Sequence, residues 1–149
     1  MNVIGMAEVD FNFKELTFFT SELLNASEDF DKFMKDFLRD MASRFLAKVI
    51  KLTPVDTGNL RNSWVIGNPT GEGIEMSIKI MNAAEYADLV EFGHRGKYVP
   101  ALGVTLFTDR FFTEGKFMMK LTAERIRWEM PKRLKKAYDE WVKKYRSLV

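Results

Sequence analysis

The chain has 149 residues, enough for one domain with a substantial hydrophobic core, and its 46% hydrophobic and 30% charged content fits a soluble globular protein. No apolar run is long enough to span a bilayer, and the N-terminus lacks the pattern of a signal peptide. We therefore expect no membrane contact and a location in the cytoplasm of the producing cell. With no cysteine, the chain has no disulfide, no thiol nucleophile and no thiolate metal site.

Charge is distributed unevenly along the chain, although its net value is only +2. Residues 1–40 carry nine acidic and four basic side chains, residues 41–115 carry eight of each, and residues 116–149 carry four acidic and eleven basic ones. The basic C-terminal part is consistent with contact to nucleic acid or another anionic surface. It is equally consistent with docking between copies or onto another assembly protein, and with a solvated helix face.

The principal element is an amphipathic helix that ends before Pro54. Upstream of it, the alternation over residues 9–13 predicts a short edge strand, and residues 15–24 are a helix candidate. Asn25 or Ser27 can cap the long helix, and acidic residues fill its first turn, where the helix dipole favours them. Its apolar residues recur at spacings of three and four, which predicts a core helix. They are Phe30, Phe33, Met34, Phe37, Leu38, Met41, Phe45, Leu46, Val49 and Leu52.

A turn follows this helix. Pro54 disfavours helical backbone at the residue before it. Asp56 can fold its carboxylate back onto nearby backbone N–H groups, and Gly58 supplies a position with positive φ. The sequence therefore assigns a structural role in this turn to Pro54, Asp56, Thr57 and Gly58.

Two strands are predicted next, at residues 61–66 and 74–81, because the glycine and proline residues of segment 67–73 mark a loop. The second strand alternates apolar and polar side chains, which is typical of an antiparallel sheet packed on one face. Its apolar positions are Ile74, Met76, Ile78 and Ile80. Residues 86–92 then predict a short helix that Gly93 ends with a left-handed cap.

Arg61 lies at the predicted start of the first strand. Its guanidinium can pair with Asp56 or with Glu91 of the short helix, which would fix the turn, or it can contact another subunit. Both interpretations stay open on the sequence.

The last third of the chain begins with an irregular segment, residues 94–112, where glycine and proline interrupt apolar side chains. Such a long loop either contacts a partner or folds back on the domain. Residues 113–129 predict a helix, and Pro131 must kink it or restart it as a second helical segment.

The order of these elements predicts an α+β fold, with long amphipathic helices packed on one face of a small antiparallel sheet. We expect a single domain over residues 1–149. Its core lies at about residues 27–93, followed by the irregular loop at 94–112 and the C-terminal helices at 113–147.

No catalytic or metal-binding arrangement is visible. His94 is the only histidine, and its neighbours Arg95 and Lys97 disfavour a bound cation. Glu91 is the nearest carboxylate that could help, and Ser63 has no histidine other than His94 for a triad. The glycines match neither a phosphate-binding loop nor a dinucleotide fingerprint. We expect neither an enzyme nor a cofactor.

Two segments together resemble the signature of a known family. Residues 53–64 contain Pro54, the Asp-Thr-Gly turn and Arg61, and residues 86–94 contain Tyr-Ala and Glu-Phe-Gly-His. Their order and spacing, after an apolar helix and around a hairpin, are similar to those of tailed-bacteriophage minor tail components, also described as tail-completion or head-to-tail joining (neck) proteins.

The resemblance implies a structural virion protein of the neck or tail. Such proteins act as copies in a ring around the DNA channel, six to match the tail, and join the head connector to tail-tube or tail-terminator proteins. Assembly would occur in the cytoplasm of the bacterial host. The alternative is a DNA-binding module that uses the basic C-terminal helices, without sequence specificity. Candidate partner contacts are Arg61, Glu91, His94, Arg95, Tyr98, Leu102, Phe107, Lys132, Arg133, Lys135 and Lys136.

Overall fold

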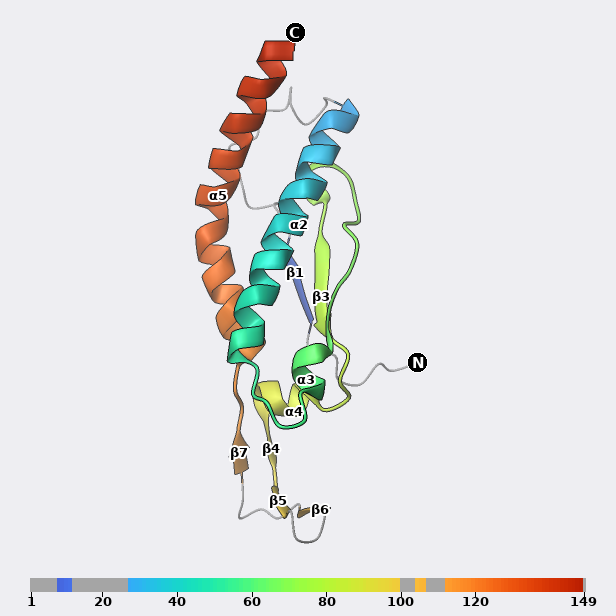
Figure 1. The fold of residues 1–149 in the computed structure, drawn as a ribbon, viewed down its shortest axis with the longest axis vertical. Coiled ribbons are helices and arrows are strands. Elements are labelled where there is room, and N and C mark those ends of the chain that lie inside the picture. Colours follow the sequence, from blue (N-terminus) through green and yellow to red (C-terminus); the bar gives the residue numbers. More distant parts are fainter. Residues whose placement is uncertain (1–7, 12–26, 100–103, 107–111, 149) are drawn as a thin grey trace.

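Two long helices dominate the structure, a computed structural model that describes residues 8–11, 27–99, 104–106 and 112–148. Helices α2 (Ser27–Leu52) and α5 (Met118–Leu148) lie side by side and run antiparallel, with a small sheet packed against them (Figure 1). The predicted α+β fold is confirmed. The helix candidate at residues 15–24 lies outside the described residues.

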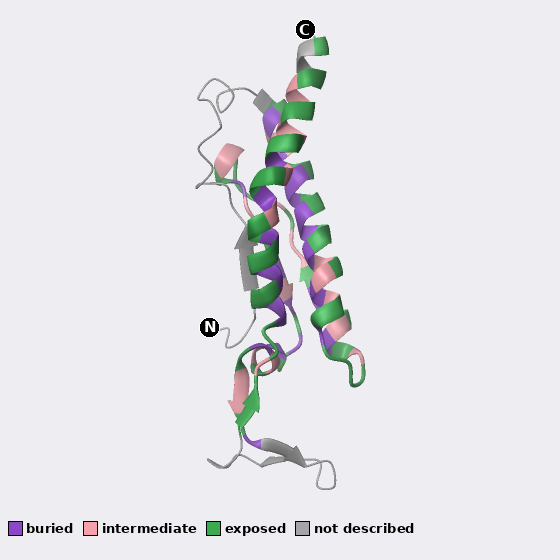
Figure 2. Ribbon diagram, turned by 90° about the vertical axis from the view of Figure 1, so that its left-hand side faces the viewer, coloured by how far each residue is buried: buried purple, intermediate pink, exposed green. Residues whose placement is uncertain are grey.

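Helix α2 is the predicted core helix. It carries Glu28 and Asp29 in its first turn and ends at Leu52, two residues before Pro54. Its buried side chains form one core with those of α5 and of the sheet (Figure 2). The fully buried large side chains of this core are Phe30, Phe45, Met34, Leu38, Met41, Met76, Ile78, Ile80, Met118 and Ile126.

Aromatic rings fill the end of the core near the C-terminus. Trp141 of α5 has its ring centroid 5.4 Å from that of Phe33 and 6.0 Å from that of Phe30, both on α2. Tyr138 contacts Phe33 at 6.2 Å. Trp141 and Tyr138 therefore join α5 to α2.

The main sheet has three antiparallel strands in the order β1-β3-β2. They are β1 (Glu8–Phe11), β3 (Ile78–Asn82) and β2 (Trp64–Ile66). The first is an edge strand, as predicted. In β3, Ile78 and Ile80 are buried while Lys79 is exposed, so the helices cover one face only. The register pairs Val65 with Met81.

The hairpin is shorter than the sequence predicts. Residues expected to start its first strand form a helical turn instead, α3 (Asn59–Asn62), which the carbonyl of Gly58 closes by accepting the amide of Asn62 at 3.0 Å. Residues expected to start the second strand form a 3₁₀ turn, η1 (Gly73–Glu75). The carboxylate of Asp31 on α2 accepts the amide of Gly73 at 2.8 Å, and this long-range bond is invisible to local periodicity.

The described residues of the segment predicted as an irregular loop form paired strands, so the prediction is wrong for them. Strands β4 and β7 pair antiparallel, as do β5 and β6. They are β4 (Gly93–Arg95), β5 (Lys97–Val99), β6 (Val104–Leu106) and β7 (Phe112–Glu114). These four strands, the β-arm below, extend beyond the ends of α2 and α3 (Figure 1).

Helix α4 (Ala87–Phe92) is present as predicted, but its end is different. Gly93 has φ 83° and ψ 171°, which is an extended backbone with positive φ and no left-handed cap. The chain therefore leaves α4 directly into β4.

Helix α5 begins at Met118, later than predicted, and continues through Pro131 as one helix, so the predicted start at residue 113 and the restart after Pro131 are wrong. The residues from 113 belong to β7 and a connecting segment. Pro131 lies on the exposed side, where water can reach the carbonyl that loses its helical donor. On the other side, Ile126, Met130 and Leu134 continue the buried stripe past the proline.

Candidate assembly surface

The turn after α2 is held by Thr53, which is 2% exposed. Its hydroxyl donates to the carbonyl of Val49 at 2.7 Å and accepts the indole N–H of Trp64 at 3.0 Å. Its own carbonyl accepts the guanidinium of Arg61 at 3.2 Å. Thr53 thus ties the end of α2 to α3 and β2, a role that the sequence analysis missed. The only signal was a buried tryptophan that needs an acceptor for its N–H.

The Asp-Thr-Gly turn is formed differently from the prediction. Gly58 has φ 87°, so the predicted positive φ is confirmed. Thr57, however, supplies the side-chain contact, because its Oγ1 accepts the amide of Asn59 at 3.4 Å. Asp56 is exposed and accepts no hydrogen bond from any described residue, so the predicted fold-back of its carboxylate is wrong.

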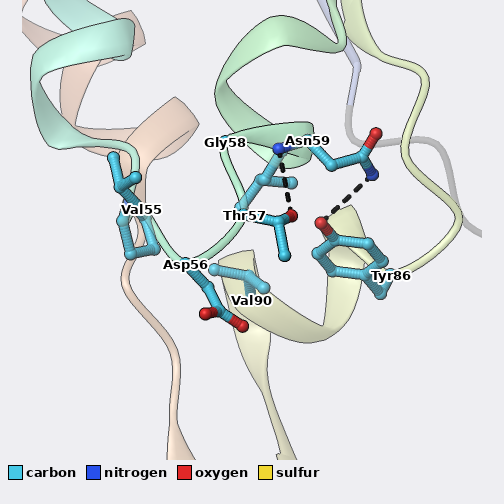
Figure 3. A pocket seen from close by; sticks show the side chains of 9 residues that line it. Val55, Asp56, Thr57, Gly58, Asn59, Tyr86 and Val90 are labelled. Atoms are coloured by element: carbon cyan, nitrogen blue, oxygen red, sulfur yellow. Dashed lines mark hydrogen bonds between the residues drawn. The ribbon is translucent and has the colours of Figure 1, made fainter.

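A pocket of about 300 Å³ opens at this turn, lined by residues 54–60 together with Tyr86 and Val90 of the α4 region (Figure 3). The hydroxyl of Tyr86 accepts the side-chain amide of Asn59 at 3.2 Å and closes one wall. Val55 and Tyr86 leave large apolar surfaces exposed beside it. We call this feature the turn pocket.

Glu91 is buried, with 1% of its surface exposed, and its carboxylate starts α5. Its two oxygens accept the backbone amides of Met119 at 2.9 Å and Lys120 at 2.8 Å, the position where a helix dipole favours negative charge. In return, the carbonyl of Glu91 accepts the amide of Phe117 at 3.0 Å. The predicted ion pairs of Arg61 with Glu91 or Asp56 are therefore wrong.

The base of the β-arm is a close backbone contact between Gly93 and Gly115. A Cβ on Gly115 would lie 2.4 Å from the carbonyl oxygen of Glu91, and a Cβ on Gly93 would lie 2.5 Å from that of Thr113. Only glycine permits this approach. Beside it, Phe92 and Phe112 are 60% and 66% exposed, which leaves an apolar surface at the base of the arm.

Of the predicted contact residues after Gly93, some lie in described strands and others lie outside the described residues. His94 lies in β4 opposite Thr113, and its Nδ1 is 3.1 Å from the carbonyl of Arg95, also in β4. Tyr98 belongs to β5. Leu102 and Phe107 lie outside the described residues.

The basic residues predicted as contacts on α5 also differ from one another, because three are exposed and one forms an ion pair. Lys132, Lys135 and Lys136 are exposed. Arg133 instead lies 3.3 Å from Glu129, which also binds Lys48 of α2 at 2.5 Å. Hydrogen bonding from Lys48, and then from Arg133, lowers the pKa of Glu129 below its ordinary value, against the opposing effect of burial.

One exposed residue on α5 was not singled out by the sequence analysis. Trp128 is 84% exposed, and Leu121, two turns earlier, is exposed on the same side. Both lie outside the apolar stripe that faces α2. Apolar residues outside the main stripe of a helix were the available signal.

Ser63 donates its hydroxyl to the carbonyl of Asn59 at 2.7 Å. Within the described ranges, no cluster of three His, Asp or Glu side chains is suited to a metal ion. None of the helices in those ranges is both long and apolar enough to cross a membrane. What the geometry offers is a set of docking features: the turn pocket, the β-arm and the outer side of α5.

Comparison with known proteins identifies one family. The model described as "Bacteriophage HK97-gp10, putative tail-component" matches residues 19–93, which is half of the chain and runs through α2, α3, the hairpin and α4. Apart from Gly93, the first residue of β4, the β-arm lies outside this match, as does α5. No curated protein and no solved structure matches the chain. The predicted resemblance is confirmed, and the chain belongs to the HK97-gp10-like family of bacteriophage tail components.

Proposed function

We propose that this structural phage tail protein acts in the neck, as a tail-completion component that joins the tail to the head connector. Several copies, six to match the tail, would form a ring around the DNA channel and contact connector and tail-tube or tail-terminator proteins. Its activity is binding alone. It would assemble in the cytoplasm of the bacterial host and remain in the virion.

The β-arm is the observation that carries this proposal beyond the family match. It extends from the helical body, and each of its strands pairs with only one other strand among the described residues. A two-stranded ribbon leaves outer edges to which a neighbouring chain can add a strand. The exposed rings of Phe92 and Phe112 at its base add the apolar surface that is typical of a protein interface.

The other residues predicted to contact a partner fall into two groups, those exposed to solvent or left untested and those bonded within the chain. Lys132, Lys135 and Lys136 are exposed and remain candidates. The same holds for His94, Arg95 and Tyr98 of the β-arm, and for Leu102 and Phe107, which lie outside the described residues. Arg61, Glu91 and Arg133 make hydrogen bonds or ion pairs inside the chain, so we give them a positioning role.

Electron microscopy of particles from a strain that lacks the gene tests the proposal. Separate heads and tails should accumulate, and the wild-type gene should restore joined particles. A Phe92→Ser/Phe112→Ser variant should fold but fail to restore them, because both rings are exposed. The matched control, Val65→Ser, changes an exposed apolar residue of β2 and should restore joining. Joined particles in the deletion strain would contradict the proposal.

DNA binding is the second candidate, favoured by the lysines that α5 exposes to solvent. These are Lys132, Lys135, Lys136, Lys143 and Lys144. Phosphate contacts release counterions, so retention of the purified protein on DNA should fall steeply between about 50 and 200 mM salt. Retention that is absent at the lower salt concentration would exclude this function.

A further inference from the structure

Among the described residues, no hydrogen bond or ring contact explains the position of Trp128. It is the most exposed of the large apolar side chains in the described part of the chain, and it projects from the side of α5 opposite the core. A tryptophan combines a large apolar ring with an N–H donor and is enriched at protein interfaces. An exposed side chain of this kind is suited to the centre of a docking surface.

The turn pocket has the size and lining to accept such a ring. Its volume of about 300 Å³ is at the lower end of pockets that hold small molecules, so it suits one large side chain better than a chain segment. Pro54, Val55, Leu60, Tyr86 and Val90 give it apolar walls. A proline, a tyrosine and branched aliphatic side chains are suited to pack against a flat aromatic ring.

Charge around the two features is complementary. Asp56 is the only charged residue that lines the turn pocket, and its exposed carboxylate accepts no hydrogen bond from a described residue. On α5, Arg125 and Lys132 are exposed one turn on either side of Trp128, against one exposed carboxylate there, Glu124. A ring seated in the pocket would bring a cation toward Asp56.

We propose that Trp128 of one copy inserts into the turn pocket of a second copy, with Arg125 or Lys132 facing Asp56. The two surfaces lie on different elements of one chain, so each copy can donate its tryptophan and accept another at the same time. Such a head-to-tail contact closes into a ring when the rotation per copy is right. The inference thus rests on the proposed ring and supplies a subunit contact for it.

One side chain and one ion pair make a small interface, below the roughly 1,000 Å² expected of a stable complex. The isolated protein is therefore expected to associate weakly, and covalent trapping is the suitable measurement. Because the natural chain has no cysteine, any introduced thiol reports a single position.

The experiment mixes two full-length variants of different mass with a short bismaleimide. Val55→Cys places a thiol on the pocket rim, and Glu124→Cys places one beside Trp128 while keeping the indole and both cations. We expect a mixed dimer as the main product. The matched control replaces Glu124→Cys by Lys144→Cys, an exposed site near the far end of α5, and should give only background.

Adding Trp128→Ala to the Glu124→Cys variant should reduce the mixed dimer to that background, and Asp56→Lys in the Val55→Cys variant should reduce it partly. These residues are exposed, so each variant should fold, and circular dichroism checks this. A yield equal to the Lys144→Cys control, a yield unaffected by Trp128→Ala, or a dimer formed mainly between two Glu124→Cys chains would overturn the proposal. Joined particles alongside any of these results would refute this contact while leaving the neck function intact.

Discussion

Glu91 is the residue on which the junction between α4, the β-arm and α5 depends. Its buried carboxylate accepts two backbone amides at the start of α5. Glu91→Ala leaves both donors without partners in a buried site, and we expect a loss of about 2 to 3 kcal/mol in the free energy of unfolding. Urea unfolding followed by circular dichroism measures it.

Glu85→Ala is the matched control, since Glu85 is exposed just before α4. Its effect should stay within about 0.5 kcal/mol. Equal stability losses for the two variants would show that Glu91 contributes no more than a surface carboxylate.

Substitution of Gly58 tests whether the turn depends on a backbone conformation with positive φ. A Cβ there would have only Asn62 within 4 Å, at 3.7 Å, so substitution produces strain from φ 87° without a clash. We expect Gly58→Val to cost roughly 1 to 3 kcal/mol and Gly58→Asn clearly less, because asparagine tolerates positive φ. Melting temperatures give the comparison. An unchanged value for the valine variant would remove the strain argument.

These residues also show which parts of the site sequence can predict. The conformations at Pro54 and Gly58 follow from the residues' own backbone preferences, and both were predicted correctly. The partners of Asp56, Arg61 and Glu91 depend on which chain segments meet in the fold. A carboxylate looks the same in sequence whether it is exposed, as at Asp56, or caps a helix that begins 27 residues later, as at Glu91.

At the level of elements, the contact between α2 and α5 combines a continuous apolar interface with one ion-pair group at its edge. Lys48 of α2 and Arg133 of α5 both bind Glu129, whose side chain is 23% exposed. Such a partly shielded group contributes more than an open surface pair, because fewer water molecules compete for its charges.

This group gives the stability of the protein a specific pH dependence. The folded-state pKa of Glu129 is lowered, so its contribution is present above the unfolded-state pKa, about 4.3 for glutamate, and is lost as pH falls through the folded value. We expect Glu129→Gln to cost about 1 kcal/mol at pH 7 and progressively less below about pH 4.3. Urea unfolding of both proteins across this range measures the difference, and a gap that widens toward low pH would contradict the assignment.

Elements with a long apolar repeat were predicted well, and short strands were not. Helix α2 and the buried face of β3 repeat the same spacing several times, so the pattern identifies them. The β-arm has strands of three residues, too short for a repeat, and its base depends on the contact of Gly93 with Gly115. Pro131 suggested a kink or a second helical segment because propensity is local, whereas packing against α2 continues on both sides of it and keeps α5 one helix.

For the whole molecule, the charge asymmetry of the sequence is only partly an asymmetry of the surface. On α2, Asp36 and Asp40 lie 3.7 and 2.8 Å from Arg39 and Arg44, so part of the acidic third is paired within its own helix. The outer side of α5 keeps its excess of lysines. The basic surface of α5 therefore has a clearer excess of charge than the acidic surface of α2, and we test the basic surface.

Reversing Lys132, Lys135 and Lys136 to glutamate, with Arg133 left in place to bind Glu129, isolates this surface. We expect stability to change by no more than about 0.5 kcal/mol per exposed site, while incorporation into particles falls, as measured by the protein that co-sediments with virions in a complemented deletion strain. The matched control reverses Lys32, Lys35 and Lys51, three exposed lysines of α2, with the same change in net charge. Equal losses for both variants would assign the effect to net charge. Normal incorporation of the α5 variant would show that its lysines are a solvated helix face, because a surface that contacts a partner cannot reverse three charges without weakening that contact.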